Sequence, residues 1–283
     1  MLVDAHVHIF WPEAVRHRRR LFHLDAYFAE LYQSERARMA TAEDLIHSME
    51  ENGIDVSIVA GFGWADAGLC REHNAYIAEA VRRYPGRLVG LAVVNPSDRR
   101  NSERELARWL DAGLAGVGEL MPNGPGYRLT DAFVMGVLAE VGRSYHVPIL
   151  VHVSEPVGHD YPGKGTVTMA EVLELATSNP ELKIVCAHWG GGLPFYELMP
   201  EVQAALKNVY YDTAAWPLLY DDRIFLAGDV LAPRKVLFAT DYPLISQSAA
   251  LKRLRSLALP PDLWAAYTGG NAFSVYMTRS SGK

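Results

Sequence analysis

Two histidines near the start of the chain, His6 and His8, are spaced so that they can hold one metal ion together. They lie in Leu2–Ile9, an apolar segment typical of a strand, and side chains on a strand alternate between its two faces. Both imidazoles therefore point the same way, about 6.6 Å apart along the backbone, a gap that rotamers can close onto one Zn²⁺ at Zn–N distances of about 2.1 Å. Asp4 falls on the same face one layer deeper, where we expect it to orient an imidazole.

Four more polar residues each stand at the end of another apolar segment: Glu119, His152, His188 and Asp241. If these segments are parallel strands, their carboxyl ends meet at one face of the molecule, which is where barrel enzymes carry their active sites. Imidazoles and carboxylates are good ligands for divalent metals. The coincidence of place and residue type predicts one metal centre built from several strands.

The elements that must position these residues alternate along the chain, short apolar segments with longer helical patterns, which indicates parallel βα units. Eight strands over this length predict a single-domain α/β protein, residues 1–283, with a (β/α)₈ TIM-type barrel; a doubly wound open sheet is the alternative. The predicted strands are Leu2–Ile9, Ile54–Ala60, Arg87–Val94, Ala115–Leu120, Pro148–Val153, Leu182–His188, Asn208–Thr213 and Lys235–Asp241.

Helix signals between the strands support this reading. In Thr41–Asn52 the first residue can cap a helix, Asp44 stands three residues on, and Gly53 provides the stop. Asp131–Tyr145 and Thr168–Ser178 carry apolar residues at spacings of three and four, which predicts two further helices.

Two long loops, Phe10–Ala40 and Ser154–Val167, follow the first and fifth strands and would rise from the face that carries the site. The second loop is consistent with a lid that closes on substrate or with an ordinary mobile loop. Side chains in or near these loops and at strand ends are candidates for binding substrate. They are Trp11, Trp64, His159, Lys164 and Trp189.

Composition narrows the class of protein. The net charge of −6 gives no general attraction to nucleic acid or to anionic membranes, so we expect a small-molecule substrate as the partner. Cys70 and Cys186 are too few for a disulfide framework and are expected to be reduced thiols of a cytoplasmic protein. No apolar run approaches the length of a membrane span. A homodimer is the generic expectation for assembly.

Taken together, these motifs resemble the metal-dependent amidohydrolase superfamily, and more closely its amidohydrolase-related (amidohydrolase 2) branch, which also contains non-oxidative decarboxylases and lactonases. The resemblance implies a metal-bearing barrel in which His6, His8 and Asp241 bind one ion, with His152 as a further ligand or a ligand of a second ion. The motifs that carry the likeness are Asp4–His8, Val151–His152, Ala187–Gly191, Ala239–Pro243 and Gly269–Ala272.

Glu119 bears on how many ions are present. Mononuclear members of this branch often lack an acid on the corresponding strand, whereas the segment Gly116–Glu119 is similar to the metal-bridging segment of TatD-type deoxyribonucleases. A carboxylate can span two cations, so we favour two ions with Glu119 between them. His6, His8 and Asp241 would then serve the first ion, and His152 and His188 the second. With one ion, His188 is a free acid or electrostatic group. Zn²⁺ is favoured and Mn²⁺ is compatible.

The function that this implies is hydrolysis of a C–N or C–O acyl bond, in a cyclic amide, a lactone or a related carboxylated compound. A metal-activated water would attack the carbonyl, and Asp241 would act as general base and then acid. One alternative is a decarboxylase of an aromatic or unsaturated acid, in which His188 or Asp241 manages the proton that replaces CO₂. The others are a TatD-like nuclease and a metal-binding protein without catalysis.

Overall fold

The computed structural model describes residues 1–278 and contains all eight predicted strands, each shorter than its sequence pattern. Neighbouring strands run parallel, in the order β1-β2-β3 and β4-β5-β6-β7-β8. The strands are β1 (Val3–His8), β2 (Val56–Ala60), β3 (Leu88–Gly90), β4 (Val117–Leu120), β5 (Ile149–Val151), β6 (Ile184–Cys186), β7 (Val209–Asp212) and β8 (Val236–Leu237).

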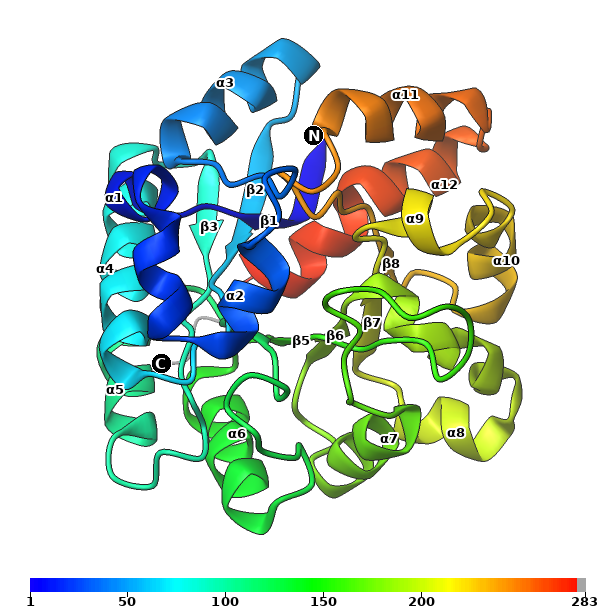
Figure 1. The fold of residues 1–283 in the computed structure, drawn as a ribbon. Coiled ribbons are helices and arrows are strands. Elements are labelled where there is room, and N and C mark those ends of the chain that lie inside the picture. The colour runs from blue at the N-terminus through cyan, green and yellow to red at the C-terminus, as the bar shows by residue number, and fades with distance from the viewer. Residues whose placement is uncertain (279–283) are drawn as a thin grey trace.

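Backbone hydrogen bonds join the two sheets into a ring. Ala92, just beyond β3, donates to Gly116 O at 2.8 Å. At the other junction Ala5 of β1 donates to Phe238 O at 2.8 Å, and His8 donates to Tyr242 O at 2.7 Å. Figure 1 shows the strands surrounded by helices, the arrangement of a TIM-type barrel, so the predicted fold is confirmed.

The helices form where the sequence places their caps. The side chains of Thr41 and Thr168 each accept a hydrogen bond from the backbone N–H three residues on, and the two helices that they begin each have a complete capping box. The α-helices are α1 (Pro12–Arg16), α2 (Ala26–Tyr32), α3 (Ala42–Asn52), α4 (Ala67–Arg83), α5 (Ser102–Asp111), α6 (Ala132–Tyr145), α7 (Met169–Ser178), α8 (Pro200–Ala205), α9 (Trp216–Leu219), α10 (Ile224–Leu231), α11 (Gln247–Ser256) and α12 (Pro261–Ala265). Helical segments of other types are η1 (Arg18–His23), η2 (His188–Leu198), η3 (Ala266–Gly270) and η4 (Phe273–Met277).

The core has an inner and an outer layer. Side chains such as Ala5, Ile58 and Leu150 pack inside the barrel, while Val7 and Val59 pack outward against the helices. This alternation leaves the carboxyl ends of the strands to line one mouth. Within residues 1–278, no helix combines the length and the apolar composition that crossing a membrane requires.

Two segments cover that mouth in Figure 1: the dark blue region that carries α1, η1 and α2, and the green loop Ser154–Val167. The first was expected to be a loop but folds into short helical turns, and Asp25 caps α2 by accepting from Phe28 N at 2.8 Å. The second has no helix or strand. The two meet where the Cβ of an alanine at position 163 would stand 2.7 Å from Leu31 Cδ2.

Candidate metal centre

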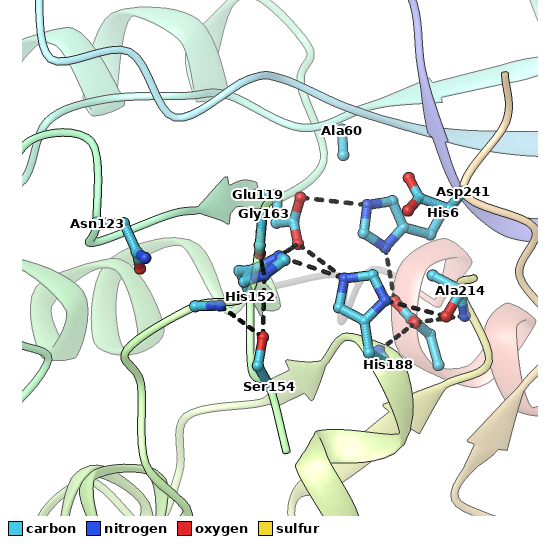
Figure 2. A network of polar contacts seen from close by, with 12 residues as sticks. His6, Ala60, Glu119, Asn123, His152, Ser154, Gly163, His188, Ala214 and Asp241 are labelled. Atoms are coloured by element: carbon cyan, nitrogen blue, oxygen red, sulfur yellow. Dashed lines mark hydrogen bonds and ion pairs between the residues drawn. The ribbon is translucent and has the colours of Figure 1, made fainter. Parts of the chain in front are cut away.

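Six residues predicted to bind metal converge at the barrel mouth, and Figure 2 shows Glu119 between His6 on one side and His152 and His188 on the other. His6 and Glu119 are at most 1% exposed, and Asp241 remains accessible with a side chain 13% exposed. The sequence pattern thus brings together side chains from five strands or strand ends. They are His6, His8, Glu119, His152, His188 and Asp241.

Two β-bulges aim the most buried of these side chains inward. On β1 the register pairs Asp4 with Ser57 and Val7 with Val59, so that Ala5 and His6 together oppose one residue of β2. Because a bulge re-aims the side chains that follow it, Ala5 and His6 both face the barrel interior.

The bulge on β4 places Glu119 in the same way. Val117 pairs with Ile149 and Leu120 with Val151, which leaves Gly118 and Glu119 opposite a single residue. Gly118 has φ +134°, and a Cβ there would lie 2.5 Å from Leu150 O, so only glycine fits beside the bulge. The sequence Gly-Val-Gly-Glu therefore reflects the backbone that presents this carboxylate.

One oxygen of Glu119 faces the β1 histidines. Glu119 Oε2 lies 3.5 Å from His6 Nε2 and 3.4 Å from His8 Nε2, and the two nitrogens are 3.1 Å apart. Asp241 Oδ1 lies 3.4 Å from His8 Nε2. These atoms surround one point and form the first subsite.

The other oxygen faces a second pair of histidines. Glu119 Oε1 lies 2.9 Å from His152 Nδ1 and 3.9 Å from His188 Nε2, and these nitrogens are 3.3 Å apart. We call this group the second subsite. The two subsites share only the Glu119 carboxylate.

Each histidine ring turns its other nitrogen toward a protein oxygen. Carbonyl and carboxylate oxygens only accept hydrogen bonds, so these outer nitrogens carry a proton, and in the neutral ring, the form that binds a metal, the inner nitrogen presents a lone pair. The outer contacts are His6 Nδ1 to Asp212 Oδ2 (2.8 Å), His8 Nδ1 to Ala60 O (3.2 Å), His152 Nε2 to Gly163 O (2.8 Å) and His188 Nδ1 to Ala214 O (3.0 Å).

This donor set fits divalent metal ions. Lone pairs that face one another at these distances repel unless a cation stands between them. Ligand atoms about 2.1 Å from a tetrahedral Zn²⁺ are about 3.4 Å apart, close to the separations within the first subsite. Metal-bound histidines characteristically donate their remaining N–H to a carboxylate or carbonyl, as all four do here.

The electrostatics of the centre point the same way. Burial alone would lower the pKa of His6, but the carboxylates of Asp212 and Glu119 outweigh it and raise that pKa well above the ordinary value. Burial would raise the pKa of Glu119, yet the imidazoles of His6 and His152 hold it well below its usual range. The centre therefore favours a carboxylate surrounded by positive charge.

Asp212 is a functional residue that the sequence analysis missed. Besides holding His6, its Oδ1 accepts from the backbone N–H of His188 at 3.1 Å and of Ala214 at 2.9 Å. It ends β7 and is fully buried. The rule that identified acids and histidines at strand ends applies to it equally, so the signal was present.

The expectation that Asp4 orients an imidazole is wrong. Its carboxylate instead accepts hydrogen bonds from Thr240 N (2.9 Å), Thr240 Oγ1 (2.7 Å) and Gln247 Nε2 (2.8 Å). The bulge that follows it puts Asp4 and His6 on opposite faces of β1, and the partner Gln247 belongs to the outer helix α11. Burial raises the pKa of Asp4 to about 6.

The backbone conformation explains the run of glycines that follows His188 and Trp189. Residues from His188 to Gly192 all have positive φ, from 56° to 96°, and form a left-handed turn. A Cβ on Gly191 would lie 2.5 Å from Ser154 O. Glycine lets this turn pack directly against the backbone that follows β5.

The three tryptophans that were predicted to contact substrate are buried in the protein core. Trp64 is fully buried and donates its indole N–H to His73 Nδ1 at 3.0 Å, and Trp11 packs 6.1 Å from it, ring centre to ring centre. Trp189 is 1% exposed and its ring packs on Phe225, 5.4 Å away, under the outer helices. Large aromatic area drives burial, and here it fills the core beside the mouth.

His159 and Lys164 lie in the loop Ser154–Val167. His159 is exposed, and its ring packs 5.6 Å from that of Tyr161. Lys164 Nζ donates to Val157 O at 3.3 Å and to His159 O at 3.2 Å, so it fastens the loop to itself. Binding of substrate by these two residues stays a prediction.

Helix α2 brings two further phenols to the mouth. Burial, followed by the Glu119 charge, raises the pKa of Tyr27, and burial followed by Asp241 raises that of Tyr32. Both phenols therefore keep their protons at neutral pH and can donate them in hydrogen bonds. In the sequence these two tyrosines stand among apolar residues, so no motif marked them as candidate site residues.

Arg18, which lies in the segment Phe10–Ala40, donates to Ala37 O at 2.6 Å and to Ser34 O at 3.1 Å. It borders a cavity of about 480 Å³ at the rim of the barrel. Arg38, Tyr242 and Ser246 also line this cavity, whereas the histidines of the centre do not.

Comparison with known proteins identifies the family. A family model described as Amidohydrolase, of the amidohydrolase 2 type, matches residues 3–277. The chain belongs to the amidohydrolase family. This match confirms the resemblance seen in the motifs. The protein is therefore a barrel of an enzyme family, and the clustered histidines and Glu119 support a divalent metal centre. No curated protein sequence matches the chain.

Solved structures share the amidohydrolase fold. A 5-carboxyvanillate decarboxylase from Novosphingobium aromaticivorans, complexed with manganese and 4-hydroxy-3-methoxy-5-nitrobenzoic acid, superposes with a TM-score of 0.76 at 20% identity, over 98% of this chain and 96% of that one. A 2,6-dihydroxybenzoate decarboxylase from Rhizobium gives 0.74 at 18%, over 98% of both chains. A probable 2-pyrone-4,6-dicarboxylic acid hydrolase from Acinetobacter baumannii, with citric acid bound, gives 0.67 at 15%, over 98% and 99%.

Proposed function

We propose that this amidohydrolase is a two-metal hydrolase that cleaves a C–N or C–O acyl bond in a small cyclic amide, lactone or related carboxylated compound. The observation that carries the proposal is the Glu119 carboxylate, whose two oxygens face two separate pairs of histidines. Such a carboxylate can bridge cations about 3.5–4 Å apart, the spacing of two-metal hydrolytic sites.

Each residue of the centre has a part in this proposal. His6, His8 and Asp241 hold the first ion, His152 and His188 hold the second, and Glu119 serves both. Bound divalent ions supply a water that is ionised near neutral pH and polarise the substrate carbonyl. Three or four imidazoles favour Zn²⁺, and the carboxylates also suit Mn²⁺, the metal in the 5-carboxyvanillate decarboxylase structure.

Asp241 is the proposed general base and acid. It is the most exposed carboxylate of the centre, and its backbone N–H donates to His6 O at 3.0 Å, which fixes it at the mouth with φ +62°. A carboxylate there can take a proton from the attacking water and return it to the leaving nitrogen or oxygen. The charge of Asp241 helps to raise the pKa of Tyr32, whose neutral phenol can donate a hydrogen bond to substrate, whereas the hydroxyl of Tyr27 donates to Gly163 O at 3.5 Å.

Decarboxylation of an aromatic or unsaturated acid is the second candidate. The favouring observation is that two of the structures described above are decarboxylases of aromatic acids. In that reaction His188 or Asp241 would deliver the proton that replaces CO₂. This candidate needs one ion and gives the Glu119 bridge no role.

Metal content and a substrate panel separate the two candidates. We expect close to two ions per chain after saturation with Zn²⁺ or Mn²⁺, and metal-dependent hydrolysis of lactones or cyclic amides that is at least about 100-fold slower in Asp241→Asn with its metal bound. One ion at saturation, with CO₂ release from a carboxylated ring compound, would replace the hydrolase by the decarboxylase. Full turnover by Asp241→Asn would end the role of that residue.

A further inference from the structure

The four outer acceptors of the histidine rings differ in where they come from. Two belong to strand ends of the barrel wall, Ala60 O on β2 and Asp212 on β7, and the third, Ala214 O, lies in the turn directly after β7. The fourth, Gly163 O, belongs to the loop Ser154–Val167. Of the four rings, His152 is therefore the one whose outer acceptor comes from a long loop and not from a strand end or the turn next to it.

The loop packs closely against that ring. Gly165 N–H donates to Ser154 Oγ at 2.7 Å, and this hydroxyl lies 3.3 Å from His152 Nε2. A Cβ at position 165 would stand 2.6 Å from His152 Cδ2. Figure 2 shows Gly163 and Ser154 beside His152, on the side away from His188. The ring is thus enclosed by loop backbone.

The loop is in turn fastened to two other elements. Asn123, beyond β4, accepts from Thr166 N at 3.0 Å and donates to Lys164 O at 3.3 Å. On the opposite side Gly163, with φ +91°, packs against Leu31 of α2. A change in either anchor would move Gly163 O relative to His152.

We propose that the loop Ser154–Val167 is a positioning element that sets whether the centre holds one metal ion or two. The inference rests on the proposed two-metal site and adds its regulation. With Nε2–H held by Gly163 O, the His152 ring directs Nδ1 into the second subsite. When the loop is displaced, the ring is free to turn, whereas His6 and His8 keep their partners on the barrel wall. The second ion is lost and the first is retained.

Gly165→Ala tests the proposal, with Val157→Ala as the control in the same loop. Alanine at 165 is forced against the His152 ring, whereas Val157 is 73% exposed and its side chain can be shortened without disturbing the packing of the loop. Metal-free protein is titrated with Mn²⁺ by calorimetry. We expect an unchanged first binding step and a second step weakened about 10-fold to 100-fold in Gly165→Ala, the range for lost outer partners of a metal ligand. Val157→Ala should keep both steps.

An EPR spectrum provides a readout that loss of stability alone would not move. Two Mn²⁺ ions that share a carboxylate are magnetically coupled, whereas one ion gives the spectrum of isolated Mn²⁺. We expect the coupled signal from wild type and from Val157→Ala, and the isolated signal from Gly165→Ala at the same metal concentration. Ser154→Ala, which removes only the hydroxyl between Gly165 and His152, is the second variant if Gly165→Ala fails to fold.

The outcomes separate this inference from the proposed function. An unchanged second step in the folded variant overturns the inference, and so does an equal loss in Val157→Ala. A single ion in saturated wild type overturns both the inference and the two-metal site. Two ions with the expected loop effect, but without hydrolysis across the panel, would support the inference and refute only the hydrolase.

Discussion

The two halves of the metal centre are built in different ways. On the β1 side, His6 and His8 come from a bulged strand and donate to oxygens at the ends of β7 and β2. On the other side, His152 follows the short strand β5 and donates to a loop carbonyl. Strand hydrogen bonds hold the first set, whereas loop packing holds the second. In the proposed site, the barrel fixes the first ion and the loop tunes the second.

The β1 half is also braced from outside. His73 Nε2 donates to Ile9 O at 2.7 Å, one residue beyond His8. His73 Nδ1 accepts from Phe62 N at 3.3 Å and from Trp64 Nε1 at 3.0 Å. This neutral, fully buried imidazole ties the end of β1 to the aromatic cluster under the first segment.

The largest effect should come from the residue that the halves share. In Glu119→Gln, a neutral amide replaces the bridging carboxylate, so we expect both metal-binding steps to weaken. We also expect kcat to fall at least about 100-fold, more than for residues that only hydrogen-bond to a metal ligand. Metal analysis and steady-state kinetics check this. Retention of two ions with unchanged affinity would show that Glu119 is no bridge.

Asp212→Asn should act chiefly on the β1 half. An asparagine that still accepts from the N–H groups of His188 and Ala214 turns its NH₂ toward His6 Nδ1, where two donors meet. We expect the first ion to bind about 10-fold to 100-fold more weakly. Calorimetric titration with Zn²⁺ measures this, and circular dichroism of the metal-free protein controls for folding. A loss confined to the second step would reverse the comparison.

Asn123→Ala should act on the other half and less strongly. It removes hydrogen bonds that hold the loop near Lys164 and Thr166, and one such bond contributes about 1 kcal/mol, or about fivefold in binding. We expect the second Mn²⁺ step to weaken by about that factor and the first to remain. Equal weakening of both steps would argue that the loop supports the whole mouth.

Acid should reduce the stability that the buried His73 gives to the end of β1. Burial lowers the pKa of His73 from 6.5 to about 4, so the unfolded chain binds a proton there before the folded protein does. The contribution of His73 to stability is complete above pH 6.5 and declines as pH falls toward 4, by up to about 3 kcal/mol. Urea unfolding of metal-free wild type and His73→Gln at pH 7.5 and 4.5 measures the difference. Equal pH dependence of the two proteins would contradict it.

Sequence reasoning reached the eight strands because β-branched segments and capped helices alternate in a regular way. It also reached the six converging residues, since acids and histidines at strand ends share one mouth. It assigned Asp4 wrongly because strict alternation does not foresee a bulge. It overlooked that Trp64 and Trp189 have enough apolar area to be buried wherever the chain allows.

Because of the two bulges, the register of β1 and β4 matters as much to the metal centre as the amino acids that these strands carry. His6 and Glu119 both face inward because one extra residue stands in β1 and one in β4. If the unchanged sequence paired regularly from the first residue of either strand, without the bulge, His6 would stand opposite Val59 and Glu119 opposite Val151, and both ligands would face the helices. Such a shift of register would leave every ligand in the sequence and a barrel of the same strand order, yet dismantle the centre, so a protein of this kind can lose its chemistry through strand register alone.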